Sequence, residues 1–266
     1  ELARNLALVT AIFAVGPIFA PLVGAVIAAP FGWRAIFGAL ALFAVGLISV
    51  LAFLPETIRQ KAPDAIAPGV LASRLMRMVR HPQSRYFLIV SAVSMASMLI
   101  ILIAAPRIYD TEFGITGTHF AMMFALHGTG IILGQTVNRR LIPRLGIVNT
   151  MIAGNCVLIA SAVLILGTAL ADILTPWSLT AFFILYSTSH LIVFSNSAAL
   201  VLDPHGDLAG FAAAAYGFVS QIGASLLAGV LVLVAGGDPV VFGITLLGVC
   251  LVLMAMIVNW QRHHRM

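Results

Sequence analysis

The side chains in this sequence that are best suited to chemistry are polar groups set within long apolar runs. His127 and His190 are imidazoles within such runs, and Ser91, Ser94 and Ser97 recur at every third residue. A neutral imidazole accepts and gives protons near pH 7, and a hydroxyl in an apolar run must find a partner or face water. The histidines are therefore candidates for proton coupling or substrate contact, or they are buried residues held by a hydroxyl or an amide.

These groups need membrane-spanning helices to position them, because the chain is too apolar for a water-soluble fold. Of its 266 residues, 61% are hydrophobic and 9% are charged, with a mean hydropathy of +1.10. A soluble domain carries about 25% charged residues. Uncharged runs long enough to cross about 30 Å of hydrocarbon recur along the chain. We predict an all-α integral membrane protein with spans near residues 6–30, 34–54, 86–105, 117–137, 147–170, 176–200, 208–235 and 239–260.

The basic residues give the orientation of these spans, because cytoplasmic segments keep an excess of Lys and Arg. If the N-terminus is cytoplasmic, all 14 basic side chains except Arg34 and Arg107 fall in cytoplasmic segments. The net charge of +5 therefore reflects membrane topology. Since the basic residues are divided among separate loops, no nucleic-acid surface is predicted.

The one long connection, residues 55–85, contains "PGVLASRLMRMVRHP". Its apolar residues Leu71, Leu75, Met78 and Val79 recur at helical spacing, with arginines away from them. This pattern predicts an amphipathic helix on the inner membrane face, and the alternative is a solvated linker.

Metal and enzyme chemistry lack support in the sequence. Cys156 and Cys250 fall inside predicted spans without a polar partner nearby, and the adjacent histidines of "QRHHRM" have no further ligands. The sequence contains no phosphate-binding glycine loop. It also contains no Ser, His and Asp residues that the predicted topology could bring together. We therefore expect no enzyme, no metal site and no cofactor.

Four motifs, in order along nearly the whole chain, resemble a known family. "VGPIFAPLVGA" is similar to the signature of the fifth helix in antiporters of the major facilitator superfamily, and "FGWRAIFGALALFAVGLISVLAFLPETI" to the turn and sixth helix that follow it. "NRRLIPRLG" is similar to the basic turn between helices eight and nine, and "AGFAAAAYGFVSQIGASLLAGVL" to helix eleven. Together they resemble the bicyclomycin and chloramphenicol resistance branch of twelve-helix drug:proton antiporters.

The resemblance implies a major facilitator fold of which eight of twelve helices are present. Residues 1–54 would be the last two helices of the N-terminal bundle, 55–85 the cytoplasmic central loop, and 86–266 the C-terminal six-helix bundle. The implied function is export of small amphipathic drugs across a bacterial inner membrane by alternating access. The partners would be the drug, protons and the lipid bilayer. The proton gradient would be the energy source, and the protein would be a monomer. No predicted span contains Asp or Glu, so we expect the proton carrier in the first four helices.

The resemblance also suggests roles for particular residues. The motif of the first span (Gly16, Pro17, Pro21, Gly24) would bend a closely packed helix that seals the outer side between the bundles, or the bend serves packing alone. The basic turn (Asn138, Arg139, Arg140, Arg144, Gly146) would act in cytoplasmic gating. Candidate cavity-lining residues are Ser94, Met98, His127, His190, Asn196 and Gln221. Helix packing is the alternative for them, since hydroxyls in spans also bond to their own helix.

Two other functions stay open. The tenth helix reads "YSTSHLIVFSNSAAL", without the glycine and proline usual in this branch, so a native metabolite such as a sugar or nucleoside is an alternative cargo. A membrane-embedded enzyme or a scaffold with the same number of spans is the alternative from another class.

Overall fold

The computed structural model describes residues 19–53, 67–235 and 237–263, and all regular structure in these ranges is helical. An apolar helix at Phe19–Phe31 comes first. It is followed by α2 (Trp33–Ala52), α3 (Pro68–Arg80), α4 (Pro82–Phe113), α5 (Gly117–Leu145), α6 (Ile147–Leu170), α7 (Pro176–Leu202), the 3₁₀ turn η1 (Asp203–Leu208), α8 (Ala209–Ala235) and α9 (Pro239–His263). The all-α membrane fold expected from the sequence is confirmed.

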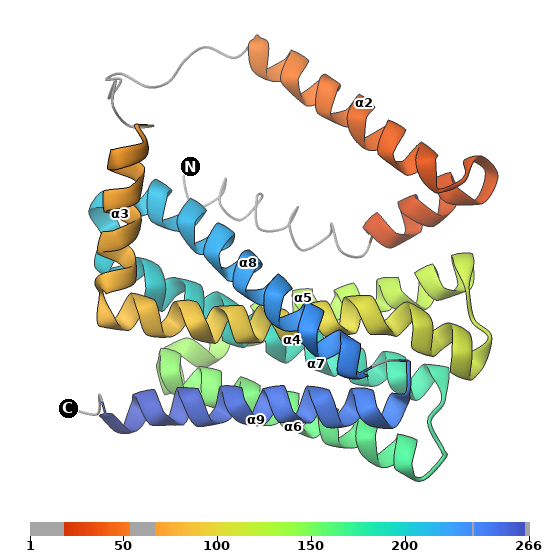
Figure 1. Cartoon of the computed structure of the whole chain (residues 1–266). Helices are drawn as coiled ribbons and strands as arrows, with labels where there is room; N and C mark the ends of the chain where they lie inside the picture. The colour runs from red at the N-terminus through yellow and green to blue at the C-terminus, as the bar shows by residue number, and fades with distance from the viewer. Residues whose placement is uncertain (1–18, 54–66, 236, 264–266) are drawn as a thin grey trace.

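Six of the described helical stretches are long and apolar enough to cross a membrane. One of them, Pro176–Leu233, is far longer than one span requires. It is divided at η1, where His205 has non-helical angles (φ −125, ψ 34), and the chain reverses there (Figure 1). This stretch therefore supplies two spans, α7 and α8, which matches the predicted pair near 176–200 and 208–235.

The helices α4 and α5 extend beyond their predicted spans. The helix α4 continues through Pro106 to Phe113, and α5 continues through Pro143 to Leu145. The prediction of a basic turn was therefore wrong in one respect, because Asn138, Arg139, Arg140 and Arg144 lie in the last turns of α5. Only Gly146 lies outside the helix, with φ +76, in the left-handed range that glycine adopts without strain.

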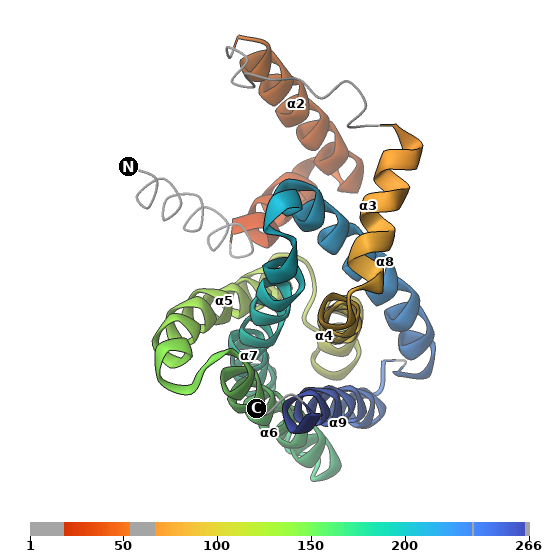
Figure 2. The same ribbon diagram turned by 90° about the vertical axis from the view of Figure 1, so that its left-hand side faces the viewer.

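The helices α4 to α9 form one bundle, in which α8 crosses α4 obliquely (Figure 1), and Figure 2 looks along the bundle with α4 nearly end on. The helices α6 and α9 lie on the side of this bundle away from α2 and the helix Phe19–Phe31. None of the residues of α2 is buried. In a bilayer its apolar surface must therefore be covered by lipid or by further helices.

Close contact between α5 and α7 comes from small residues. A Cβ atom on Gly130 would overlap the Ser187 hydroxyl and the Ile184 carbonyl oxygen, and one on Gly134 would overlap the Thr188 carbonyl oxygen. Glycine lets helix backbones approach this closely. Both positions therefore fix α5 against α7.

The predicted amphipathic helix is α3, which runs across the bundle at the start of α4 (Figure 1). Met78 is 2% exposed, and Leu75 and Val79 pack against the core of the bundle. Three of the four apolar residues of the predicted face thus contact the bundle, whereas Leu71 is 38% exposed. The location of α3 on the inner membrane face stays a prediction.

Candidate functional site

Polar side chains of α4, α7 and α8 meet inside the bundle. Ser94 Oγ lies 3.2 Å from His190 Nδ1, and Ser91 Oγ lies 2.8 Å from the Tyr216 hydroxyl. Both serines are fully buried, while His190 and Tyr216 each keep 7% of their surface exposed. We call these four residues, together with Phe194, the α4–α7–α8 cluster.

The protons in this cluster can be partly assigned. The Tyr216 hydroxyl donates to the Phe194 carbonyl at 3.2 Å, because a carbonyl only accepts. Its single proton is then used, so Ser91 donates to the Tyr216 oxygen. The Phe194 ring stacks on the His190 imidazole, with centroids 5.7 Å apart. The cluster therefore combines hydroxyl and imidazole groups with an aromatic face, and it contains no charged side chain.

The helix α4 contributes two further residues that the sequence singled out. Ser97 donates to the Ser94 carbonyl of its own helix at 2.7 Å, which is the local bonding that was the alternative for the serines. Met98 is half-buried, one helical turn beyond Ser94. The three serines thus serve different purposes, and Ser91 and Ser94 contribute to the α4–α7–α8 cluster.

His127 lies apart from this cluster, between α5 and α7. Its Nδ1 is 3.1 Å from the Phe183 carbonyl oxygen and therefore carries the proton in that bond, and its ring stacks on Phe124 with centroids 5.2 Å apart. The Nε2 atom is buried and has no partner among the described residues. His127 is thus a buried residue held by a backbone carbonyl, with one nitrogen unbonded.

The other two candidate residues lie in unlike environments. Asn196 is 2% exposed and exchanges hydrogen bonds with Asn138 (2.8 and 3.4 Å), so these amides join α7 to the C-terminal part of α5. Gln221 on α8 is exposed. The sequence predicted a cavity role for Asn196 and a gating role for Asn138, whereas in the structure the two residues contact each other.

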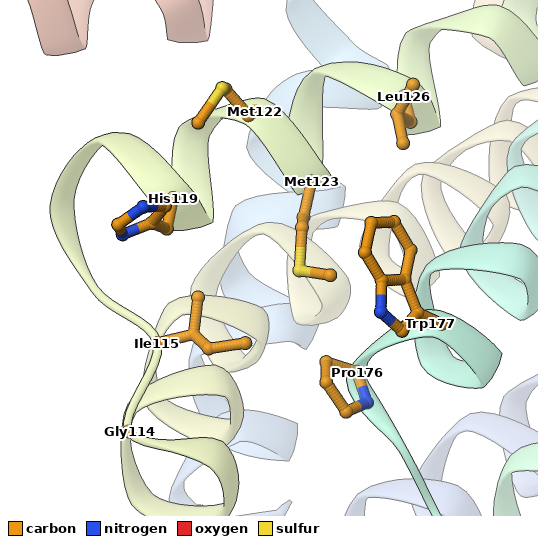
Figure 3. Close-up of a pocket in the computed structure, with 8 residues that line it drawn as sticks. All are labelled: Gly114, Ile115, His119, Met122, Met123, Leu126, Pro176 and Trp177. Carbon is orange, nitrogen blue, oxygen red and sulfur yellow. The ribbon is translucent and has the colours of Figure 1, made fainter.

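A pocket opens where α4 turns into α5 (Figure 3), and we call it the outer pocket after the orientation expected from the basic residues. It has a volume of about 540 Å³, within the range of about 300–1,000 Å³ that small-molecule sites have. The Met123 and Leu126 side chains point between α5 and α7, toward Trp177. Its lining comes from the α4–α5 turn, α5 and the start of α7: Gly114, Ile115, His119, Met122, Met123, Leu126, Pro176 and Trp177. It contains no Asp, Glu, Lys or Arg, so it suits uncharged apolar molecules. No sequence pattern predicts this pocket, because its walls are ordinary apolar residues.

The signature helix of the first span borders a second cavity. Pro21, Gly24 and Ala28 of the helix Phe19–Phe31 face Gly117 and Ala121 at the start of α5 across a volume of about 440 Å³. Gly16 and Pro17 lie outside the described residues. The described part of the motif therefore faces the start of α5.

A further set of contacts, also absent from the sequence analysis, joins the start of α4 to η1. Ser84 Oγ lies 2.9 Å from His205 Nε2, and Arg77 of α3 pairs with Asp207 at 2.7 Å. These partners are more than 120 residues apart in the sequence, and no periodic pattern relates them.

The family model of the Major Facilitator Superfamily matches residues 1–228. The chain is 22% identical over 222 residues to a bicyclomycin resistance protein homolog of Haemophilus influenzae, covering 82% of this chain and 55% of that protein. It is 28% identical over 199 residues to a chloramphenicol resistance protein of Pseudomonas aeruginosa, covering 73% of this chain and 44% of that protein. An uncharacterized MFS-type transporter of Bacillus subtilis, YdgK, is 25% identical to the chain over 240 residues, covering 85% of this chain and 57% of that protein.

The chain thus spans about half the length of the curated relatives it matches. The resemblance read from the four motifs is confirmed, and the names of these relatives support the expectation of a transporter rather than an enzyme. Because the family model matches most of the chain and the structure supplies membrane-spanning helices, this chain belongs to the major facilitator superfamily.

Proposed function

We propose that this chain is part of a proton-driven exporter of small amphipathic drugs in a bacterial inner membrane. The observation that carries the proposal is the α4–α7–α8 cluster. Its hydroxyl and imidazole groups surround an aromatic ring, and it has no charged side chain. A binding site lined by this cluster suits uncharged aromatic compounds that carry hydroxyl or amide groups, a class that includes chloramphenicol. The names of two relatives support this class of cargo.

The mechanism would be alternating access, in which two bundles rock about a site near the middle of the membrane. The helices α4 to α9 would move as one body, because the α5–α7 contact is too close to slide. Ser94, His190 and Tyr216 would bind the drug in the state that exposes them to the cytoplasm. Proton binding would shift the equilibrium between the two states toward the state that binds the proton with higher affinity.

The proline-containing helix would seal the outer side between the bundles. Gly24 and Ala28 face the start of α5, so a large side chain there would enter the cavity that they share. Gly24→Leu should therefore reduce export severalfold without preventing insertion, as measured by drug accumulation and by the amount of protein in the membrane. Gly38→Leu on the exposed face of α2 is the control. Unchanged export by Gly24→Leu would refute the seal.

Drug accumulation in efflux-deficient cells that express the full gene product tests the role of the cluster. We expect His190→Ala and Ser94→Ala each to reduce chloramphenicol export at least about tenfold, the effect of about 1.4 kcal/mol in binding. His263→Ala is the matched control, because His263 is exposed and its Nδ1 bonds to the Asn259 carbonyl of its own helix. Equal export by all three variants would contradict a binding role for the cluster.

A further inference from the structure

The turn between α7 and α8 lies at the cytoplasmic end of the bundle and contacts the central-loop helix α3. Arg77 of α3 pairs with Asp207 of η1 at 2.7 Å, and the two side chains are each 55% exposed. A single exposed ion pair contributes little stability. Breaking this one therefore needs only a small change in the charges around it.

One such charge is that of His205, two residues before Asp207. Its side chain is 3% exposed. Ser84 Oγ lies 3.0 Å from the Val201 carbonyl oxygen and 2.9 Å from His205 Nε2. Because the carbonyl only accepts, Ser84 donates to it, and His205 Nε2 donates to the Ser84 oxygen. A second proton on His205 would then bind at Nδ1.

Charged and titratable groups from each neighbouring element act on His205. Burial lowers the pKa of His205, electrostatic interaction with His81 and Arg77 lowers this pKa further, and Asp207 raises it. The rings of His81 and His205 meet edge to face with centroids 5.6 Å apart. The hydrogen bond from Arg77 lowers the pKa of Asp207, so this carboxylate stays ionised and available to either cation.

We propose that the contact between α3 and η1 is a latch that opens on cytoplasmic acidification. When His205 is neutral, Asp207 pairs with Arg77, and this ion pair holds α3 against η1. With His205 protonated, the imidazolium competes for Asp207 and repels Arg77, and α3 is released. The pocket, the cluster and the direction of transport play no part in this step, so the latch can be tested apart from export.

The sign of the pH effect follows from the shifted titration. Because the latched state disfavours the protonated form of His205, the released state binds the proton more readily. Acid therefore favours release, and the latched state is favoured above the ordinary pKa of histidine, about 6.5. A proton-driven exporter brings protons into the cytoplasm, where this latch would respond to them.

The distance between spin labels on α3 and α8 tests the latch. Labels at Ser73→Cys and Ala213→Cys, both exposed positions, are placed in the full gene product with Cys156→Ala and Cys250→Ser. We expect one narrow distance at about pH 8 and a second, longer distance whose share rises at least about threefold by about pH 5.5. The same distribution at both pH values would overturn the proposal.

Three variants separate the latch from a general loosening of the protein. His205→Asn keeps a donor for Ser84 and cannot gain the charge, so it should stay latched at both pH values. Arg77→Gln should show the released distance at both. The exchange Arg77→Asp with Asp207→Arg should restore the latch, and it should remain closed in acid because the carboxylate introduced on α3 then attracts the imidazolium. A pH response that persists in His205→Asn, in a monodisperse preparation, would show that His205 is not the switch.

Discussion

At the residue scale, polar side chains in the spans fall into two groups. Some bond within their own helix, as Ser97 does to the Ser94 carbonyl. Others join two helices, as Ser94 does to His190 and Asn138 to Asn196. A hydrogen bond between helices inside the bundle satisfies groups that lipid cannot, so the second group has greater influence on the arrangement of α4, α5 and α7.

The packing of Gly130 gives a prediction at this scale. Gly130→Ala should lower the free energy of unfolding in detergent by about 1–3 kcal/mol, because the added Cβ would overlap Ser187 and the Ile184 carbonyl oxygen. The matched control is Gly167→Ala in α6, where a Cβ would meet nothing within 4 Å. Equal stability of the two variants would show that α5 and α7 are not in close contact in the membrane.

Sequence reasoning reached only part of the site, and the reason is physical. It identified Ser94 and His190 because polar residues inside apolar runs are rare and stand out. It treated Asn138 and Asn196 as members of different sites, because spacing along one helix does not reveal the partner on another. His205 and Asp207 were missed, since they lie in a short polar turn of ordinary composition and acquire a role only through Arg77 and Ser84.

At the element scale, helix existence was predicted better than helix ends. Hydropathy located α6 at its observed bounds, Ile147–Leu170, because a span is defined by its apolar length. The ends of α4 and α5 were misjudged, because polar residues and prolines can continue a helix into the interface. The amphipathic pattern of α3 was read correctly as a helix, but the pattern alone does not say whether protein or lipid covers the apolar face.

The outer pocket gives a prediction at the element scale. Trp177 is 68% exposed and lines this pocket, so its fluorescence reports binding there. With every other tryptophan replaced by phenylalanine, chloramphenicol should quench Trp177 saturably, because the uncharged apolar lining suits an uncharged aromatic compound.

The control for this measurement is a protein that keeps only Trp260, which packs against Tyr86 and Phe87. Its fluorescence should fall only linearly, by collision with free drug. Linear quenching of Trp177 as well would show that the pocket does not bind the drug.

At the scale of the whole molecule, the chain supplies a bundle of six helices together with α2 and the helix Phe19–Phe31, and it spans about half of its curated relatives. The α4–α7–α8 cluster lies inside the bundle, the outer pocket lies at one end, and the proposed latch lies at the other end. This order along the membrane normal suits a transporter that binds its cargo near the middle and changes shape at both ends.

Transport by the purified full gene product in liposomes tests the central claim most directly. With a proton gradient as the only energy source, radiolabelled chloramphenicol should accumulate on the side from which protons leave, and a protonophore should abolish its accumulation. His190→Ala should reduce the initial rate at least about tenfold, and His263→Ala should not. Accumulation of the drug in the same direction as the protons, or transport that is indifferent to the gradient, would contradict the proposal of a proton-driven drug exporter.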